Sequence, residues 1–398
     1  MSRHRICDLD QCLDRRCFES SKWRRYDEDV LPLWVADMDF RSPEPVIRAL
    51  HERVEHGVFG YGRDTPELRE VIVERLQRLY DWQVSPEELI FLPGVVTGFN
   101  LACHAFTSPG DGVLLQTPVY GPMLHAAEGA GLTNDEMELT RRADGYYEID
   151  FDLMQETINE RTRIFILCNP HNPVGRVFRR DELERMAELC LRHGIVICSD
   201  EIHGDLILSG HRHVPIASLA PAIAERTITL MAPSKTYNVP GLKCSVAIVQ
   251  NEELREKLTC THTGLVHGVN ILGYTAALAA YRDGPLAGRG AALCGGQSRL
   301  AARGRGVGPA GHQHEQAGRH LPGLAELPRG RDTRQSQRVP SGESPGGRER
   351  WSLVWAGWRG VRALELRLPT LCAGRGTGEN GSGNAQPGVM PAGALRSL

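Results

Sequence analysis

The hydrophobic and polar positions of this sequence follow two alternating patterns from about Pro43 to Gly284. Short apolar runs rich in β-branched residues are typical of buried strands, and longer amphipathic stretches separate them. Residues 181–192 have helical spacing, and Gly194 is placed to cap the end of that helix. The strand-like runs are residues 113–116, 163–168, 195–198, 227–231 and 245–249. This alternation predicts an α/β fold with a mostly parallel sheet covered by helices.

The pattern stops near Ala287. Beyond this residue the chain contains no Lys, Ile, Phe or Tyr, whereas Gly and Arg are frequent, and neither helical nor strand periodicity continues. Composition alone is typical of a disordered, basic tail. An unfamiliar folded domain and a shifted reading frame are the other hypotheses for this segment.

Length and charge narrow the class of protein. The 398 residues allow one large α/β domain and a smaller one, and the formal net charge of −3 does not favour nucleic acid or an anionic membrane. No run approaches the roughly 18 apolar residues of a membrane helix, and the N-terminus has no apolar signal region. We therefore expect a cytoplasmic protein. The eleven cysteines show no CxxC spacing, which favours buried free thiols over a metal site.

The residues that directly follow the apolar runs are the candidates for chemistry, because parallel sheets bind ligands at the carboxyl ends of their strands. Lys235 follows the 227–231 run, between small and polar residues. A lysine there can form a Schiff base if its ammonium pKa is lowered. A surface lysine in a loop is the alternative interpretation, and the neighbouring segments weigh against it.

Two polar residues follow two other runs. Asp200 ends the run after residue 195, where an unpaired buried carboxylate would be costly, and a pyridinium nitrogen would be a suitable partner. Asn172 lies in the turn Asn-Pro-His-Asn-Pro-Val-Gly after the 163–168 run, and its amide could bind a ring hydroxyl. Alone, such a turn is more often only a turn.

Two further segments suit a flat, phosphorylated ligand. Val95 and Val96 follow a glycine turn and begin a helical stretch, whose exposed amides suit a phosphate. Tyr120, in Thr-Pro-Val-Tyr-Gly-Pro, could stack on a flat ring, and a core or turn tyrosine is an equal alternative.

In this order along the chain, these segments resemble the fold-type I pyridoxal-phosphate enzymes of the class I/II aminotransferase superfamily. They most resemble the MalY/PatB branch, the cystathionine β-lyases. Asp200-Glu-Ile-His203 has no tyrosine after Asp-Glu, where transaminases commonly have one. Residues 34–40 (Trp-Val-Ala-Asp-Met-Asp-Phe) resemble the entry motif of the branch, and residues 59–62 resemble its tyrosine-bearing loop. The resemblance extends from about Asp14 to Gly284.

The resemblance implies a role for each matching residue. Lys235 would hold pyridoxal 5′-phosphate covalently, Asp200 would face the pyridine nitrogen, Asn172 the ring hydroxyl, and Tyr120 the ring face. Around the phosphate it implies Val95, Val96, Ser234 and Lys243, with Tyr61 arriving from a partner chain and with His203 and Asn238 behind the site. It also implies a homodimer with shared active sites.

The implied reaction is a carbon–sulfur β-lyase reaction on an amino-acid substrate. Lys235 would act as general base at Cα, a thiolate would leave from Cβ, and cystathionine would yield homocysteine, pyruvate and ammonia. The alternatives are an aminotransferase, an inactive relic, and a protein that acts by binding a transcription regulator.

The family ends in a small domain with an arginine that binds the substrate carboxylate, and the tail contains no match to it in the frame as written. Read one nucleotide later with free third codon positions, residues 298–327 can encode VDWLLEAVGSDLPGISMNKPAGTYLAWLN. In the same frame, residues 350–372 can encode RWFGPGGEGFVRLNFACPRSV. Both strings resemble the missing domain. We therefore hypothesise a frameshift between about Leu286 and Gln297.

The expected organisation has three parts. Residues 1–45 would contribute to the small domain, and residues 46–285 would form the large cofactor-binding domain. Residues 286–398 would occupy the place of the remaining small α/β domain, out of frame and disordered as written.

Overall fold

The structure is a computed structural model that describes residues 13–28, 30–208 and 210–282. Residues 13–26 and 32–282 within these ranges belong to one compact unit, and every contact discussed below lies in it. The expected segment 286–398 and the hypothesis of a frameshift lie outside the described residues. Among the described residues, no helix is long and apolar enough to cross a membrane.

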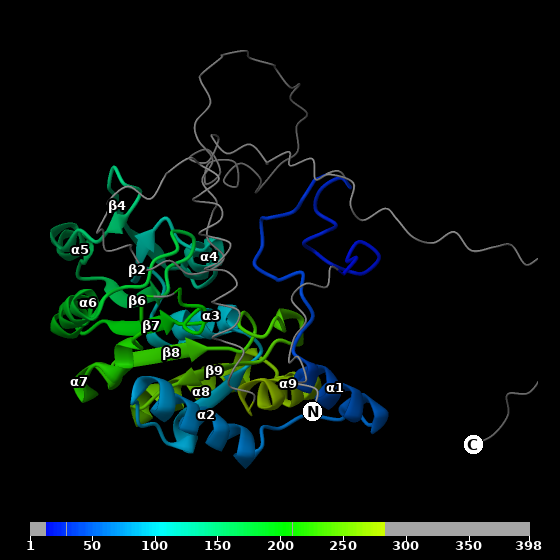
Figure 1. Ribbon diagram of the computed structural model, residues 1–398. Helices are drawn as coiled ribbons and strands as arrows, with labels where there is room; N and C mark the ends of the chain where they lie inside the picture. The colour runs from blue at the N-terminus through cyan, green and yellow to red at the C-terminus, as the bar shows by residue number, and fades with distance from the viewer. Residues whose placement is uncertain (1–12, 29, 209, 283–398) are drawn as a thin grey trace, which may run out of the picture. The chain divides into compact units, whose positions relative to one another are not determined.

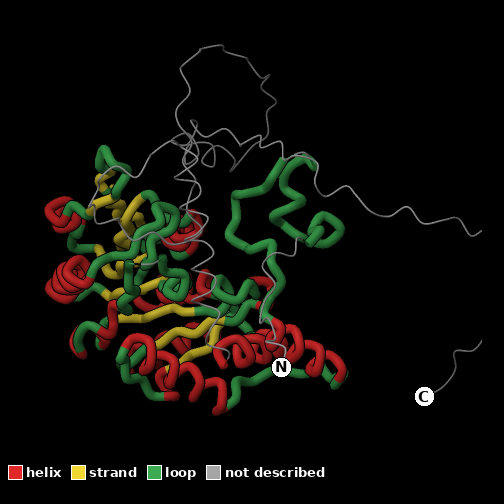
Figure 2. Tube along the Cα trace, in the orientation of Figure 1, coloured by secondary structure: helices red, strands yellow, loops and turns green. Residues whose placement is uncertain are grey.

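A seven-stranded sheet forms the centre of the unit, with the strand order β1-β9-β8-β7-β6-β2-β3 (Figures 1 and 2). β9 is antiparallel to both of its neighbours, and the other pairings are parallel. The prediction of a mostly parallel sheet is therefore confirmed. The strands are β1 (Leu89–Leu92), β2 (Gly112–Thr117), β3 (Thr133–Glu138), β6 (Thr162–Cys168), β7 (Val196–Asp200), β8 (Thr227–Met231) and β9 (Ser245–Ile248), beside the small ribbon of β4 (Thr140–Arg141) and β5 (Tyr147–Glu148).

Helices cover both faces of this sheet (Figure 1). The strands are buried on both sides, so successive apolar side chains point into different cores. Val113 and Leu115 pack in one core with residues of α3, α4 and α8, whereas Leu114 packs in the opposite core with residues of α5 and α6. The helices on these two faces are α3 (Val95–Phe106), α4 (Gly121–Gly129), α8 (Glu252–Leu265), α5 (Phe151–Thr157), α6 (Arg180–Arg192) and the short α7 (Pro221–Ala224).

A further core lies beside β1 and β9. Here α1 (Glu44–Glu55), α2 (Pro66–Tyr80) and α9 (Ile271–Arg282) pack against the apolar side chains of these two strands. Short 3-10 turns complete the connections: η1 (Pro86–Glu88), η2 (Ile216–Ser218) and η3 (Pro240–Leu242). Gly273 of α9 lies against η3, and a Cβ there would meet the Leu242 carbonyl oxygen at 2.5 Å.

The sequence predicted this sheet unevenly. Each of the five apolar runs coincides with a strand, namely β2, β6, β7, β8 and β9. The predicted helix at 181–192 is α6, whose C-cap residue is His193, and Gly194 follows with a left-handed φ of 67°. The five runs did not include β1 or β3. Most of β3 is polar and exposed, and only Met137 of this strand is buried.

All seven cysteines of the described residues are free, as expected, but Cys17 and Cys260 are exposed, so the expectation of burial is wrong for these two. Cys103, Cys168, Cys190, Cys198 and Cys244 are free and buried, and burial raises the pKa of each thiol. Thiols of this kind are inert members of a core rather than nucleophiles.

Candidate active site

The predicted site residues converge on one edge of the sheet. Because β9 is antiparallel to both β8 and β1, β1 runs in the same direction as β8 and the other parallel strands. The carboxyl ends of β1, β2, β6, β7 and β8 therefore meet at a single edge. The segments that leave these ends carry Val95 and Val96, Tyr120, Asn172, Asp200 and Lys235.

Lys235 and Asp200 form the electrostatic centre of this edge. Burial lowers the pKa of the Lys235 ammonium, and the carboxylates of Asp200 and Asp37 oppose that shift. Burial raises the pKa of Asp200 to about 7, although the Ile202 backbone N–H donates to its Oδ1 at 3.1 Å and Lys235 lies nearby. Asp200 is only 5% exposed. Both side chains are thus held where their charged forms are poorly solvated.

This pair fits a pyridoxal-type cofactor. A protonated pyridine nitrogen would give the buried Asp200 carboxylate the counter-charge that solvent does not supply there. A lysine with a lowered pKa keeps more of its amine neutral, which is the form that attacks a carbonyl. Ser234, beside Lys235, is buried as well, whereas Lys243 is exposed with a left-handed φ of 47°.

The amino end of α3 supplies donors to the same edge. Gly94 is the N-cap residue with a φ of 133°, a conformation that side chains rarely adopt, and no side chain caps the helix. The first N–H groups of a helix have no partner within it, so those of Val95 and Val96 suit a phosphate. The Gly94 N–H itself donates to Ser245 Oγ at 3.2 Å, which anchors the turn to β9.

Tyr120 and Asn172 leave the ends of adjacent strands. Tyr120 is 39% exposed, and burial together with the nearby Asp200 raises the pKa of its hydroxyl. Asn172 is half-buried, and its backbone N–H donates to Cys168 Sγ at 3.4 Å. His171, which was not predicted, links the two turns because its ring nitrogens lie 2.9 Å from the Pro118 carbonyl and 3.1 Å from the Cys168 carbonyl.

The entry motif at residues 34–40 wraps over the lysine. Lys235 Nζ donates to the Ala36 carbonyl oxygen at 3.1 Å. Asn238 accepts from the Met38 N–H at 3.0 Å and donates to the carbonyls of Met38 and Phe40. Asn238 therefore ties the lysine loop to the N-terminal segment, and its place behind the site stays a prediction.

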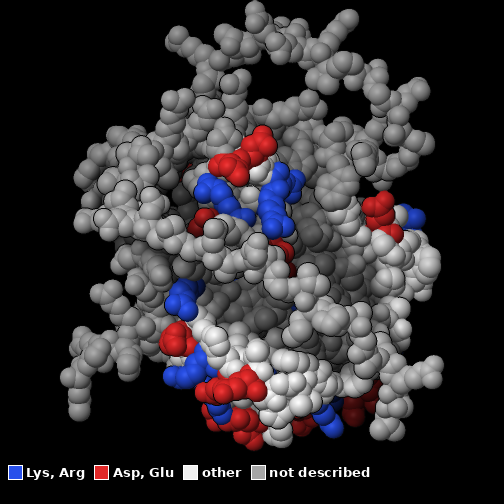
Figure 3. All heavy atoms as spheres, turned by 90° about the vertical axis from the view of Figure 1, so that its right-hand side faces the viewer, with Lys and Arg blue, Asp and Glu red and all other residues white. Residues whose placement is uncertain are grey.

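An ion cluster supports this N-terminal segment. Arg15 contacts Asp37 at 2.6 Å and Asp39 at 2.8 Å, and Lys22 contacts Asp39 at 2.7 Å. The Trp23 indole also donates to Asp39 at 2.8 Å. On the face drawn in Figure 3, the visible basic and acidic side chains of the described residues likewise lie next to one another.

Two predicted site residues, His203 and Tyr61, do not lie directly at the ends of the strands. His203 is buried in the turn after β7, and its carbonyl accepts from the Leu206 N–H at 2.9 Å. Tyr61 is fully exposed in the loop between α1 and α2. The structure thus brings the residues of the strand ends together and leaves Tyr61 pointing into solvent.

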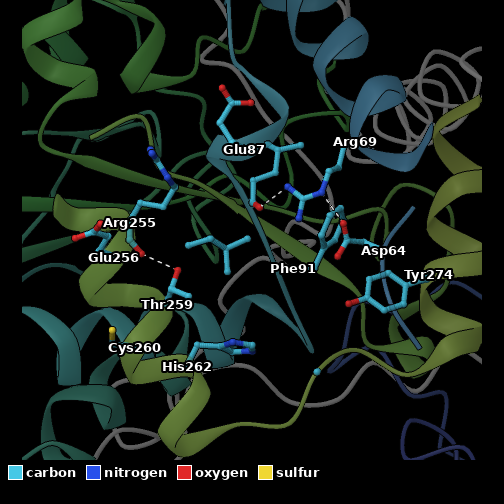
Figure 4. A pocket seen from close by; sticks show the side chains of 13 residues that line it. Asp64, Arg69, Glu87, Phe91, Arg255, Glu256, Thr259, Cys260, His262 and Tyr274 are labelled. Atoms are coloured by element: carbon cyan, nitrogen blue, oxygen red, sulfur yellow. Dashed lines mark hydrogen bonds and ion pairs between the residues drawn. The ribbon is translucent and has the colours of Figure 1, made fainter. Parts of the chain in front are cut away.

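The loop that carries Tyr61 is nevertheless anchored. Arg69 contacts Asp64 at 2.5 Å and donates to the Leu89 carbonyl of β1 at 3.0 Å (Figure 4). A Cβ at Gly62 would lie 3.0 Å from the Ile271 Cα, so the loop also touches the start of α9. The hollow of about 620 Å³ in Figure 4 lies beside these residues and includes none of the strand-end residues around Lys235.

The sequence matches the family Aminotransferase class I and II over residues 28–297. It is 42% identical over 288 residues to the cystathionine β-lyase PatB of Bacillus subtilis, covering 70% of this chain and 73% of that protein. The structure resembles cystalysin from Treponema denticola, which contains pyridoxal 5′-phosphate (TM-score 0.73, 32% identity, 76% of this chain and 79% of that chain). It also resembles the pyridoxal-phosphate-bound C–S lyase from Staphylococcus hominis (TM-score 0.69, 31% identity, 74% and 76%).

Proposed function

We propose that this chain, which belongs to the class I and II aminotransferase family, is a pyridoxal-phosphate-dependent carbon–sulfur β-lyase. Its substrates would be cystathionine or related cysteine S-conjugates, and its products a thiol, pyruvate and ammonia. The observation that carries the proposal is that a lysine with a lowered pKa, Lys235, and the buried Asp200 both lie at the carboxyl edge of the sheet. The fold is that of the fold-type I pyridoxal-phosphate enzymes.

Each residue at the edge would have a defined task. The cofactor, when bound, acts as an electron sink for the bond cleavages at the substrate amino acid. Lys235 would hold the cofactor and then move the Cα proton, a task that suits an amine whose pKa burial has lowered. Asp200 would hold a proton at the pyridine nitrogen, Asn172 would bind the ring hydroxyl, and Tyr120 would cover the ring face. Val95 and Val96 would bind the phosphate through their N–H groups.

The remaining contacts to the cofactor are proposed from position. Ser234 and Lys243 flank the lysine loop, and we assign them to the phosphate. His203 is assigned to the support of Asp200. The anchored loop with its exposed Tyr61 favours a homodimer in which this tyrosine reaches the phosphate bound to the other subunit. We place the protein in the cytoplasm, with no nucleic acid or membrane partner.

The domain organisation completes the proposal. Residues 46–285 would form the cofactor-binding domain, and residues 1–45 would contribute to a small domain. The rest of that domain would be encoded in the shifted frame of residues 286–398. The carboxylate-binding arginine is then supplied only when the frame is restored, and the chain as written would have little activity.

The β-lyase and aminotransferase hypotheses differ in their products. The full chain and a frame-restored version would be incubated with pyridoxal phosphate and cystathionine, and pyruvate, free thiol and keto-acid amination would be measured. We expect pyruvate and thiol in equal amounts from the frame-restored chain, and none from a Lys235→Ala variant. Amino transfer to a keto acid without pyruvate would establish the aminotransferase instead.

A further inference from the structure

A buried polar chain connects α2 to the lysine loop. Arg75 Nη2 of α2 contacts Asp205 Oδ1 at 2.5 Å, and Thr236 Oγ1 donates to Asp205 Oδ2 at 3.0 Å. The Arg75 and Asp205 side chains are only 7% and 13% exposed. Thr236 is also buried and is the residue next to Lys235. This series of polar contacts therefore ends at Thr236, the residue next to Lys235.

The Asp205 carboxylate links Arg75 of α2 to Thr236 of the lysine loop. Its two carboxylate oxygens have different partners, so the Arg75 guanidinium sets the orientation that the Thr236 hydroxyl then follows. The Arg75 guanidinium also lies over the Tyr281 ring of α9, 5.4 Å from its centroid. Arg75 of α2 thus contacts both Asp205 and a ring of the neighbouring helix α9.

The opposite side of the loop has its own anchor. Asn238 ties the loop to Met38 and Phe40, and Lys235 itself donates to the Ala36 carbonyl. Lys235 therefore lies between the contacts with the N-terminal segment and the polar contacts that link Arg75, Asp205 and Thr236. Asp205 belongs to the same segment as Asp200, which leaves the end of β7 five residues earlier.

We propose that Arg75, Asp205 and Thr236 are positioning residues, which hold Lys235 at a fixed depth beside Asp200. The position of the amine does not depend on which reaction the enzyme performs, although its use in catalysis rests on the proposed function. Among the described residues, the charges that act on the amine are those of Asp200 from β7 and Asp37 from the N-terminal segment. A purely structural role would stabilise the fold without changing the properties of the amine.

The test measures the amine directly, without cofactor. The full chain would be acylated with acetic anhydride over a range of pH, and labelling of Lys235 would be quantified by mass spectrometry against the exposed Lys257 in the same molecules. Thr236→Val removes the hydroxyl with little change of shape, and Thr236→Ser retains it as the matched control. Without the hydroxyl the lysine loop is no longer held by Asp205, and the Lys235 amine becomes more accessible to solvent. Its pKa then rises towards the ordinary value, so we expect the pH midpoint of labelling in Thr236→Val to rise by about half a pH unit or more. The Thr236→Ser midpoint should stay at the wild-type value.

An unchanged midpoint in Thr236→Val would overturn the proposal, and so would equal shifts in the two variants. If Thr236→Val does not fold, Arg75→Lys decides, because it keeps the charge but loses the planar guanidinium. A raised midpoint in Arg75→Lys supports positioning, and a wild-type midpoint refutes it. Borohydride trapping of added pyridoxal phosphate at Lys235 then tests the proposed function separately. Failure of trapping in the wild type would refute cofactor binding and leave the acylation result standing.

Discussion

Replacement of Asp200 by Asn should make the cofactor-free protein more stable at alkaline pH. Burial raises the pKa of Asp200 from 3.8 to about 7 in the folded chain. The folded state then keeps this proton up to about pH 7, whereas the unfolded chain loses it near its ordinary pKa of 3.8. The stability associated with the protonated carboxyl is therefore complete below the unfolded pKa and is lost as the pH rises through the folded pKa.

The magnitude follows from the size of the shift. One pKa unit corresponds to about 1.4 kcal/mol, so the full loss is about 4 kcal/mol, and the part between about pH 5 and pH 8 is roughly 2.5 kcal/mol. Asp200→Asn removes the titration and keeps the shape of the side chain. We expect the free energy of unfolding of the wild type to fall by this amount relative to the variant over that interval.

Urea denaturation of the cofactor-free chain at the two pH values measures this difference. Asp152→Asn, on the exposed surface of α5, is the matched control and should follow the wild type. Saturating pyridoxal phosphate should reduce the loss in the wild type, because a pyridinium would neutralise Asp200. If the free energy of unfolding changes with pH in the same way in the wild type and in Asp200→Asn, the argument is refuted. The buried Asp200 carboxylate would then be compensated even without the cofactor.

Three further outcomes are expected. Gly273→Ala should destabilise the protein by about 1–3 kcal/mol, because the added Cβ would meet the Leu242 carbonyl oxygen. Gly264→Ala is the control and should leave the stability unchanged, because Gly264 in α8 has open space around it. Thermal unfolding measures both variants. Gly94→Ala should weaken the affinity for pyridoxal phosphate about tenfold or more, because a side chain at a φ of 133° is strained and would displace the amino end of α3. Fluorescence titration measures this affinity, with Gly121→Ala as the control. Equal affinities of the two variants would mean that the α3 turn is unimportant for binding. Lys235→Ala should abolish borohydride trapping, and retained trapping would exclude Lys235 as the residue that holds the cofactor.

Local pattern accounts for most of the sheet. The run at 227–231 predicts β8 to the residue, because a run rich in apolar and β-branched residues is typical of a strand buried on both faces. β3 carries no such run, since it lies at the sheet edge with Met137 as its one buried side chain. Its pairing with β2 uses backbone groups, which leave no signal in the sequence.

The site was predictable where a side chain acts directly and unpredictable where the backbone or a distant partner does. Lys235, Asp200 and Tyr120 follow apolar runs, so their spacing alone placed them at one edge of the sheet. The contact from Lys235 to the Ala36 carbonyl involves a backbone oxygen 199 residues away and depends on no particular side chain. The pairing of Arg75 with Asp205 does join two particular side chains, but they are 130 residues apart in the sequence, so no local pattern reveals it.

The limits of the family match bear on the hypothesis of a shifted frame. The match to the class I and II aminotransferases ends at residue 297, and the first string encoded in the shifted frame begins at Ser298. PatB of Bacillus subtilis is covered over 73% of its length, so more than a quarter of that protein lies outside the match. The end of the match at residue 297 coincides with the end of the interval in which the hypothesis places the frameshift. Sequencing of codons 283 to 315 decides the matter: a missing or extra base would restore the small domain, and an unchanged reading would mean that the cell makes a chain without it.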